Sequence, residues 1–292
     1  MKDKIVMISG AASGLGYATA HKLALMGATT ILLDRSEHKL HEVRQALNRS
    51  TQNPNIDYLA ADLSLMSEVR RVVNTFSEFY DRLDVLINNV GVICPTLEYT
   101  LEGHEKTIAT NHYSWFLMTH LLADHLGNSP EPRIINVASD DHKQAKFDLS
   151  DINCEKNFNP LLAYANSKLA MISSTYQLAK KLENTHITIN CVHPGYAKTQ
   201  LTDSIKKRSI GSRLMDWSQK KLSPASATKV QMHLATSGEV QGVNGKYWNE
   251  ECKAVKTSRD SYDEIFALRI WKHTEEVVGL HQSQNQEDHS YT

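Results

Sequence analysis

Tyr164 and Lys168 are the first residues whose types and spacing suggest chemistry. They stand four positions apart in the run LLAYANSKLAMISS, whose pattern predicts a helix over about 161–183. This spacing places both side chains on one face of the helix. A phenol has an ordinary pKa of about 10, and a neighbouring ammonium favours the phenolate and lowers that pKa. The pair could therefore transfer a proton, although a Tyr and a Lys often share a solvated helix face without any function.

Ser139 offers a hydroxyl to the same chemistry. It ends the run RIINVAS, in which residues 133–137 predict a buried strand. In a parallel sheet, ligands bind at the carboxyl ends of the strands. A carbonyl that becomes an alkoxide needs hydrogen-bond donors where the negative charge develops. Ser139 is therefore a candidate to hold a substrate oxygen.

Three glycines, Gly10, Gly14 and Gly16, lie between an apolar run at 5–8 and a segment with helical spacing. Glycines let the backbone turn tightly and approach a pyrophosphate, and the helix N-terminus adds free N–H groups and the positive end of a dipole. The spacing GxxxGxG differs from the GxGxxG dinucleotide fingerprint. The loop can therefore be interpreted as a pyrophosphate site or as a tight turn that binds nothing.

Asp34 ends the second apolar run and follows Gly14 by about 20 residues, where an acid can hold the ribose 2′-hydroxyl of NAD. Arg35 comes next and could accept the 2′-phosphate of NADP, or it could be a solvated residue at a helix start. Because a carboxylate repels a phosphate, the sequence favours NAD as the cofactor, moderately, over NADP.

Short apolar runs alternate along the chain with longer helical patterns. The runs are at 5–8, 30–34, 56–60, 85–87, 133–137 and 187–192, and helical patterns include those at about 36–49, 65–80, 103–127 and 161–183. This alternation is typical of βαβ units with helices on both faces of a parallel sheet. We expect the fold class α/β, with a doubly wound, Rossmann-like parallel sheet. We expect one oxidoreductase domain over 1–280 and a disordered tail at 281–292.

Composition excludes several classes of protein. The 292 residues include 32 Lys and Arg against 33 Asp and Glu, a net charge of −1, and 41% of them are hydrophobic. The chain is therefore neither disordered nor a nucleic-acid binder that relies on a basic field. We expect no nucleic-acid partner, whereas a homo-oligomer is compatible with the sequence.

Cysteine and histidine spacing gives no sign of a metal site or a disulfide framework. The cysteines, Cys94, Cys154, Cys191 and Cys252, form no CxxC pair, and the fourteen histidines form no HExxH motif. The apolar residues before Gly10 are too few for a signal peptide, and no run reaches the length of a membrane span. We expect reduced thiols, no metal, and a cytoplasmic location.

Taken together, the motifs resemble those of the short-chain dehydrogenase/reductase family in its single-domain form. The matching segments cover about residues 4–200 in the family's order: SGAASGLG at 9–16, AADLS at 60–64, NNVG at 88–91, Asn111, NVAS at 136–139, YANSK at 164–168 and HPGYAKT at 193–199. The long gap between Ser139 and Tyr164, with GVNGKYW near residue 245, is similar to the retinol-dehydrogenase-like and protochlorophyllide-reductase-like branch. The resemblance implies hydride transfer between a nicotinamide cofactor and an alcohol/carbonyl substrate, apolar or lipid-like.

The resemblance also implies catalytic roles. Tyr164 would be the general acid/base, and Lys168 would bind the nicotinamide ribose and lower the pKa of the phenol. Ser139 would hydrogen-bond the substrate oxygen, and Asn111 would hold a water in a proton relay. The intact set argues against the main alternative, a catalytically silent NAD(P)-binding regulator. A sugar-nucleotide epimerase shares the Tyr and Lys spacing but usually has a different glycine loop and a larger C-terminal domain.

For the cofactor, the resemblance implies contacts from residues of the matched motifs: Ser9, Gly10, Ser13, Gly14, Leu15, Gly16, Asp34, Arg35, Asp62, Leu63, Asn88, Val90, Gly91, Tyr164, Lys168, Pro194, Gly195 and Thr199. Asp62 would contact the adenine and Asn88 the adenine-ribose side. Pro194, Gly195 and Thr199 would line the nicotinamide amide. The motifs depart from the usual pattern at three positions: Ser9 stands where the family usually has Thr, Val90 where it has Ala, and Ala138 where many members have a second Ser. None of these changes removes a catalytic group.

Two further features remain open. A basic amphipathic stretch at 201–222 could be a lid over an apolar substrate, near 200–223, or a peripheral membrane contact. Asp140 and Asp141 could be solvated loop residues or could make the pocket mouth hostile to anions. His142, just after Ser139, could touch the substrate, whereas His112, beside Asn111, is interpreted as a helix-packing residue.

Overall fold

The computed structural model describes residues 1–196 and 222–280. Its centre is an eight-stranded sheet of order β3-β2-β1-β4-β5-β6-β7-β8, in which β8 alone pairs antiparallel to its neighbour. The strands are β1 (Ile5–Ser9), β2 (Thr29–Asp34), β3 (Ile56–Ala60), β4 (Val85–Asn88), β5 (Arg133–Val137), β6 (Thr188–Val192), β7 (Tyr247–Trp248) and β8 (Ala254–Val255). The expected α/β class and parallel sheet are confirmed.

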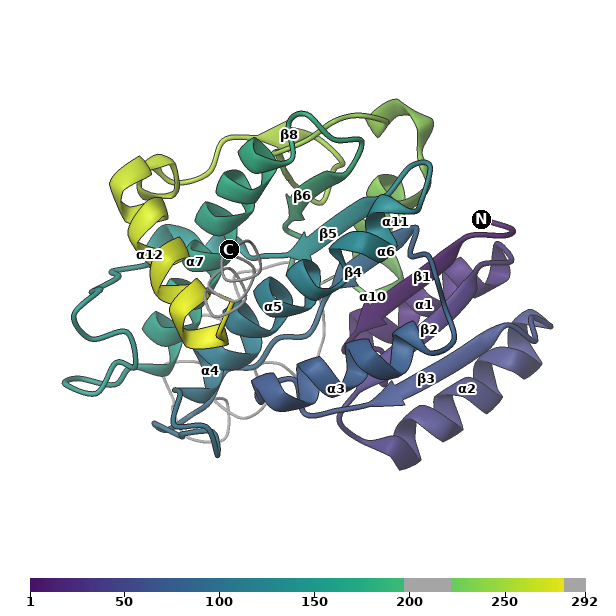
Figure 1. The fold of residues 1–292 in the computed structure, drawn as a ribbon, viewed down its shortest axis with the longest axis horizontal. Helices are drawn as coiled ribbons and strands as arrows, with labels where there is room; N and C mark the ends of the chain where they lie inside the picture. The colour runs from purple at the N-terminus through teal and green to yellow at the C-terminus, as the bar shows by residue number, and fades with distance from the viewer. Residues whose placement is uncertain (197–221, 281–292) are drawn as a thin grey trace, which may run out of the picture.

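Helices cover both faces of the sheet (Figure 1). One face carries α1 (Gly14–Leu25), α2 (Glu37–Thr51), α10 (Pro224–Ala227) and α11 (Lys229–Thr236). The other face carries α3 (Met66–Ser77), α5 (Ser114–Leu121), α7 (Pro160–Lys181) and α12 (Glu264–Val278). Shorter elements are α4 (Lys106–Ile108), the π-helix η1 (Ala109–Tyr113), α6 (Ala123–Gly127), and the 3₁₀ turns η2 (Asp140–Gln144), η4 (Gly238–Val240) and η5 (Arg259–Tyr262).

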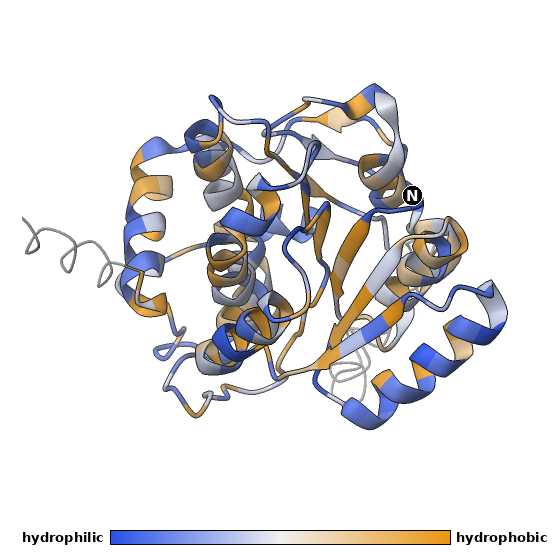
Figure 2. Cartoon of the chain, turned by 45° about the vertical axis from the view of Figure 1, so that its right-hand side comes forward, coloured by the Kyte–Doolittle hydropathy of each residue, from blue (hydrophilic) through white to orange (hydrophobic). Residues whose placement is uncertain are grey.

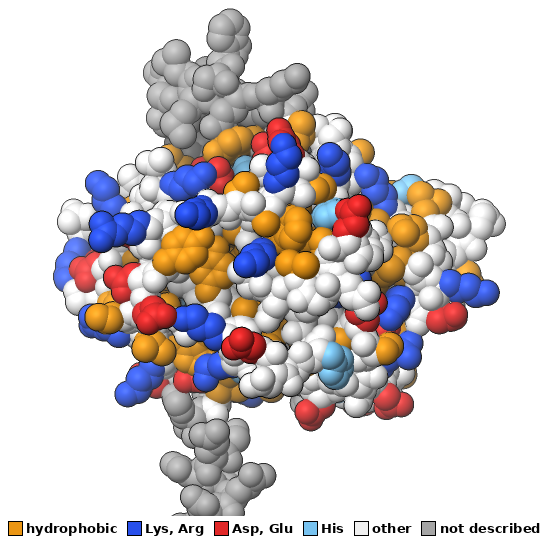
Figure 3. Space-filling view, turned by 90° about the horizontal axis from the view of Figure 1, so that it is seen from above, with side chains coloured by type: hydrophobic (Ala, Val, Ile, Leu, Met, Phe, Trp, Pro, Cys, Tyr) orange, Lys and Arg blue, Asp and Glu red, His pale blue; other side chains and the backbone are white. Residues whose placement is uncertain are grey.

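Two hydrophobic cores follow from the alternation of side chains along the strands. In β1, Met7 packs into the core beneath α3 and α5, whereas Val6 and Ile8 pack into the core beneath α1 and α11. Strands buried on both faces become continuous apolar runs, which Figure 2 shows as hydrophobic strands between helices with hydrophilic outer faces. The face shown in Figure 3 has positive and negative side chains interspersed among hydrophobic ones, as the near-zero net charge suggests.

The structure departs from the sequence-based prediction in its C-terminal part and in one helix. We did not predict β7 and β8, which have two residues each, or α12. The single helix expected over 103–127 is divided by η1 and by a break at Leu122. The expected tail at 281–292 and most of the basic stretch at 201–222 lie outside the described residues.

The strand order reverses between β1 and β4, so a crevice opens at the carboxyl ends of these neighbouring strands. Ser9, Asp34, Asn88 and Ser139 lie at or just beyond the ends of their strands, on this same edge of the sheet. Throughout 1–196 and 222–280, no helix is both long enough and apolar enough to cross a membrane. In the same ranges, no three His, Cys, Asp or Glu side chains form a group that could hold a metal ion.

Candidate active site

In the glycine loop, the backbone at Gly16 packs closely against the backbone at Gly10. Gly10 and Gly14 have φ angles of +69° and +56°, in the left-handed region that favours glycine. A Cβ at Gly16 would lie 2.1 Å from the carbonyl oxygen of Gly10, so any side chain there would force the loop to move. Ser13 precedes α1 without a side-chain cap, and the first turn of α1 contains no acidic residue. The loop therefore presents a helix N-terminus that is suited to an anion.

Ser9 connects this loop to the segment after β4. Its hydroxyl accepts hydrogen bonds from the backbone N–H groups of Asn89 and Val90, each at 3.0 Å. The Asn89 side chain donates to the carbonyl of Ser9 at 2.9 Å and accepts from Gln231 of α11 at 3.2 Å. We did not predict this bridge: Asn89 belongs to the NNVG motif, but nothing in the sequence links it to Gln231, 142 residues further along the chain. The bridge fixes the two loops that border the crevice.

Asp34 lies beside the glycine loop, as its spacing predicted. Its carboxylate accepts hydrogen bonds from the backbone N–H of Ala12 at 3.2 Å and from that of Arg35 at 2.8 Å. Arg35 is exposed at the start of the loop that leads to α2. The acid is thus held by backbone donors, while the arginine side chain extends to solvent.

The candidate cofactor residues that follow β3 and β4 differ in their burial and in their contacts. Asp62 is half-buried after β3 and accepts from the backbone N–H of Ser64 at 3.0 Å, while Leu63 is buried. Val90 and Gly91 are half-buried, and a Cβ at Gly91 would lie 3.7 Å from both the Asn111 Oδ1 and the Lys168 Nζ atoms. Gly91 therefore borders the catalytic residues.

Asn88 differs from the other candidate cofactor residues, because its side chain points into the interior of the domain. Its side chain is buried and donates to the Asn136 side chain at 2.8 Å, and Asn136 donates in turn to Thr175 at 2.8 Å. This chain of amides and a hydroxyl ties β4 to β5 and to α7. The structure thus uses the Asn88 side chain inside the domain, and only its backbone remains for the adenine-ribose side.

Asn111 lies in the π-helix η1 and is fully buried. Its amide nitrogen donates to the carbonyl of Val92 and to the hydroxyl of Ser167, each at 3.0 Å, and its Oδ1 accepts from the Val92 N–H at 2.8 Å. Short π-helical segments inside α-helices occur often at functional sites. Asn111 therefore fixes the segment after Gly91 against α7, next to the Tyr164–Lys168 pair.

Lys168 is the most tightly enclosed cation of the site, with 2% of its surface exposed. Its ammonium donates to the carbonyl of Val137, at the end of β5, at 2.8 Å. Burial lowers the pKa of Lys168 to about 8, although Cys191 and Asp141 act in the opposite direction. The ammonium lies 5.7 Å from the centre of the Tyr164 ring, so the expected pair on one helix face is present.

Tyr164 is also buried, with 5% of its surface exposed. Burial raises its pKa above the ordinary value, and Asp141 raises it further, whereas a hydrogen bond with the Ser139 hydroxyl lowers it. The direction is opposite to the lowering that we expected from Lys168, because loss of hydration on burial is the largest cause of the shift. The phenol is thus protonated at neutral pH.

Ser139 begins the turn η2 beyond β5. Its hydroxyl accepts from the backbone N–H of Asp141 at 3.2 Å and meets the Tyr164 phenol. Asp140 is not a free loop acid, because its carboxylate accepts from Tyr247 at 2.9 Å and pairs with Lys143 at 2.6 Å. Asp141 lies close enough to Tyr164 to raise its pKa, and the Tyr196 hydroxyl donates to it at 3.4 Å.

The segment after β6 completes the described site. Pro194 is buried, and Gly195 has a φ angle of +76°. A Cβ at Gly195 would lie 2.8 Å from the side chain of Leu222, whose N–H donates to the carbonyl of Tyr196 at 2.9 Å. Thr199 and the expected lid lie outside the described residues.

These residues fit a dinucleotide cofactor. The cradle at Gly10 and Gly16 has no room for a side chain, and the N-terminus of α1 faces the crevice. On the other side of the strand-order reversal, Ser139, Tyr164 and Lys168 lie together around the end of β5. The structure therefore places a loop that could hold a pyrophosphate at the same edge of the sheet as side chains that could exchange a proton.

Comparisons with known proteins agree with this arrangement. Residues 4–209 match the family described as short chain dehydrogenase. Retinol dehydrogenase 14 of Homo sapiens is 34% identical over 297 residues, which cover 96% of this chain and 88% of the relative. Polyprenol dehydrogenase of Homo sapiens is 30% identical over 285 residues, covering 95% of this chain and 86% of the relative.

A solved structure gives the same result for the fold. The crystal structure of an uncharacterized protein from Mycobacterium paratuberculosis has a TM-score of 0.75 and 26% identity, covering 95% of this chain and 94% of the other. The resemblance to the retinol-dehydrogenase-like branch is confirmed by the curated relatives. The chain therefore belongs to the short-chain dehydrogenase family and is an NAD(P)-dependent oxidoreductase that transfers hydride between a nicotinamide cofactor and an alcohol/carbonyl pair.

Proposed function

We propose that the substrate is a lipid-like alcohol or its carbonyl counterpart and that it reacts at Ser139, Tyr164 and Lys168. Two relatives are named for retinol and for polyprenol, alcohols that carry apolar isoprenoid chains. The observation that carries the proposal is that the Ser139 hydroxyl lies close enough to the buried Tyr164 phenol to lower the pKa of that phenol. Both hydroxyls can then bond one substrate oxygen.

Tyr164 is the proton donor and acceptor in this proposal. Because its phenol is protonated at neutral pH, it can give its proton to a carbonyl oxygen while the carbonyl carbon gains hydride. In the oxidation, the alcohol proton returns to the phenolate oxygen and the hydride leaves the carbon. The nicotinamide cofactor, when bound, accepts or supplies that hydride. Ser139 donates a hydrogen bond to the substrate oxygen where negative charge develops.

Lys168 and Asn111 support the proton transfer. The Lys168 ammonium stabilises the phenolate that remains after the proton has left, and its other protons can bond the nicotinamide ribose. The Asn111 Oδ1 already accepts one hydrogen bond, so it can accept one more, from a relay water. Asn111 would therefore connect Lys168 to solvent.

For the cofactor itself, we propose that Asp34 favours NAD moderately over NADP. The carboxylate is fixed at the carboxyl end of β2 by two backbone donors and can accept the ribose hydroxyls. The glycine loop would hold the pyrophosphate, Asp62 and Leu63 the adenine, Val90 and Gly91 the ribose region, and Pro194 and Gly195 the nicotinamide amide.

We also propose a cytoplasmic location with peripheral membrane contact. Cys94, Cys154, Cys191 and Cys252 are free in the structure, and free thiols are typical of proteins in a reducing compartment. A lipid-like substrate would be reached from a membrane surface. Fractionation of cells that express the chain would test this, because release of the protein by high salt indicates peripheral contact and release only by detergent contradicts it.

A substrate panel tests the reaction. Purified protein is assayed by cofactor fluorescence with retinol, a polyprenol and propanol, and with the matching aldehydes, using both cofactors. We expect turnover of the two lipid alcohols to exceed that of propanol, and Tyr164→Phe supplies the inactive control. Turnover confined to propanol would overturn the proposed substrate class. Ser139→Ala should lower kcat by about 10²–10³-fold, and a change in KM alone would contradict the role of Ser139.

A further inference from the structure

His142 lies directly behind the proposed catalytic serine, and both of its ring nitrogens are engaged. His142 is buried, with 1% of its surface exposed. The Nδ1 atom lies 2.7 Å from the carbonyl oxygen of Ser139, and the backbone N–H of Ser258 donates to the Nε2 atom at 3.0 Å. Because that backbone N–H can only donate, Nε2 must be the acceptor, and Nδ1 carries the proton that is donated to Ser139.

This arrangement excludes the substrate contact that we considered for His142 from the sequence. The ring faces neither crevice nor solvent, and neither nitrogen is available to a ligand. Burial lowers its pKa below the ordinary value, although Asp140 acts in the opposite direction, so the imidazole is neutral at pH 7. The imidazole is therefore a fixed bridge between two backbone groups.

The far end of the bridge is a short C-terminal segment, residues 254–262, which we call the strap. It contains β8 and η5, and it is closed on itself by the Ser261 hydroxyl, which donates to the carbonyl of Ser258 at 2.6 Å. Its Thr257 hydroxyl lies 3.0 Å from the Tyr176 hydroxyl of α7. The strap is thus attached to the domain by polar contacts on both sides.

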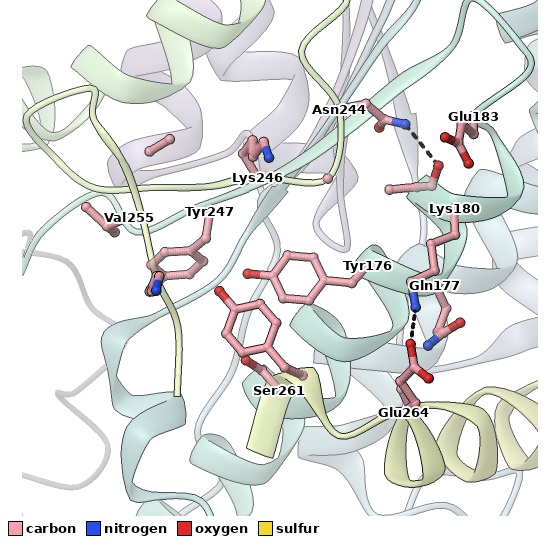
Figure 4. A pocket seen from close by; sticks show the side chains of 16 residues that line it. Tyr176, Gln177, Lys180, Glu183, Asn244, Lys246, Tyr247, Val255, Ser261 and Glu264 are labelled. Carbon is pink, nitrogen blue, oxygen red and sulfur yellow. Dashed lines mark hydrogen bonds and ion pairs between the residues drawn. The ribbon is translucent and has the colours of Figure 1, made fainter. Parts of the chain in front are cut away.

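A cavity lies between the strap and the C-terminal half of α7. It has a volume of about 790 Å³ and is lined by Tyr176 and Tyr247 (Figure 4). Tyr262 also lines it. The strap is held in place by the stacking of its Tyr262 ring on the Tyr176 ring of α7, with ring centres 5.4 Å apart, and by hydrogen bonds. The bond from Ser258 to His142 is one of them.

A second link joins the same turn to the wall of the cavity. The Tyr247 hydroxyl of β7 donates to the Asp140 carboxylate at 2.9 Å, and its ring lies 5.4 Å from the His142 ring. Asp140 and His142 are neighbours of Ser139 in η2. The turn that carries the proposed catalytic hydroxyl is therefore held from behind by β7 and by the strap.

We propose that His142 is a positioning residue, which sets the Ser139 hydroxyl toward the substrate by holding the Ser139 carbonyl against the strap. The inference rests on the proposed role of Ser139. It extends the reacting site to a part of the chain, 254–262, that no catalytic motif reaches. Tyr247 assists by holding Asp140.

Amide variants can separate the two halves of the bridge. In His142→Asn, the amide nitrogen can replace Nδ1 and keep the bond to Ser139, while the bond from Ser258 is lost. In His142→Gln, the amide oxygen can replace Nε2 and keep the bond from Ser258, while the donor to Ser139 is lost. Because both ends of the bridge are needed to hold the Ser139 carbonyl against the strap, we expect each variant to lower kcat about tenfold, with KM nearly unchanged in both.

A double-mutant cycle tests whether His142 acts through the serine. His142→Phe should lower kcat by about 10–100-fold in the wild-type background, but much less in the Ser139→Ala background, because the hydroxyl that it positions is then absent. Full additivity of the two changes would overturn the proposal. Tyr247→Phe keeps the ring and should lower kcat about threefold, so it provides a second, well-folded variant.

His120 supplies a matched control. Its Nδ1 also lies 2.7 Å from a backbone carbonyl, that of Phe116, but this contact lies within α5. His120→Asn should leave kcat unchanged. If Ser139→Ala lowers kcat while His142→Gln and His142→Phe do not, the inference about His142 fails and the proposed function stands. If Ser139→Ala has no effect, the catalytic role of Ser139 and the inference fail together.

Discussion

The two halves of the proposed site, which we call the cofactor side and the catalytic side, are formed by different kinds of atoms. On the cofactor side, the glycine loop is defined by an absence of side chains, since a Cβ at Gly16 would lie 2.1 Å from a backbone oxygen. On the catalytic side, Ser139, Tyr164 and Lys168 are buried side chains that hold one another and the end of β5. We therefore expect the cofactor side to be disrupted by a substitution that adds an atom, and the catalytic side by a substitution that removes one.

The two regions also differ in what holds them. The cofactor side relies on backbone donors, such as the Ala12 N–H that binds Asp34, and on the Ser9 hydroxyl. The catalytic side relies on a second layer of buried polar side chains, including Asn111 and Ser167. Substitutions on the first side should change cofactor binding and stability, whereas substitutions on the second should change turnover.

The largest effect should come from removing one atom on the catalytic side. Tyr164→Phe deletes only the hydroxyl that carries the proton, and the ring can still fill its buried site. We expect kcat to fall by about 10²–10⁴-fold, with cofactor affinity nearly retained. Steady-state rates and cofactor titration by fluorescence measure the two quantities separately. A Phe variant as active as the wild type would remove Tyr164 from the mechanism.

Adding one carbon on the cofactor side should have the opposite signature. Gly16→Ala places a Cβ against Gly10, and such overpacking costs roughly 1–3 kcal/mol, so we expect a lower Tm and a weaker dinucleotide Kd. Gly127→Ala, in α6, is the matched control, because a Cβ there meets no atom within 4 Å. If Gly16→Ala bound the cofactor as tightly as the wild type, the glycine loop would not be the pyrophosphate site.

The contrast between the two regions also explains how much could be predicted from sequence. Backbone requirements leave glycines and strand-ending residues in fixed order, so Gly10, Gly16 and Asp34 were found at their expected places. Strands β1 to β6 of the parallel sheet were predicted because burial on both faces produces apolar runs. Residue type and i, i+4 spacing were enough to pair Tyr164 with Lys168.

Features that depend on distant contacts could not be predicted in this way. β7 and β8 have two residues each, so they contain no alternation to detect, and their pairing depends on β6. The burial of the Asn88 side chain against Asn136 looks the same in sequence as exposure to a ligand. The rise in the pKa of Tyr164 depends on the environment that the whole fold creates, and no local spacing reveals it.

Lys168 permits a test of how strongly the catalytic side is enclosed. Burial lowers its pKa to about 8 from 10.5, so between these pH values the unfolded chain binds more protons than the folded one. Stability should therefore rise with pH in this window, by up to about 1.4 kcal/mol per pH unit. Chemical denaturation of wild type and Lys168→Met at pH 7 to 10 measures the difference, which cancels the other titrations. A difference that stays flat over this window would show that the ammonium is solvated.

The smallest expected effect is the choice between NAD and NADP, and it returns to the cofactor side. The Asp34 carboxylate is fixed by the N–H groups of Ala12 and Arg35, so it cannot turn away from a ribose at the end of β2. It would accept hydrogen bonds from the hydroxyls of NAD but would repel the roughly two negative charges of a 2′-phosphate. The exposed Arg35 could offset this by pairing with the phosphate. We therefore expect a modest preference for NAD in the wild type.

Two substitutions decide which residue controls this choice. Asp34→Ser removes the repulsion and should shift the ratio of kcat/KM values for the two cofactors toward NADP, by about tenfold for each 1.4 kcal/mol of repulsion removed. Arg35→Ala should leave NAD use nearly unchanged, because the guanidinium has no partner on an unphosphorylated ribose. If the wild type instead prefers NADP strongly and Arg35→Ala abolishes that preference, then the arginine controls the choice. In that case the preference between NAD and NADP would depend on one exposed side chain, although the cofactor side is otherwise held by backbone groups.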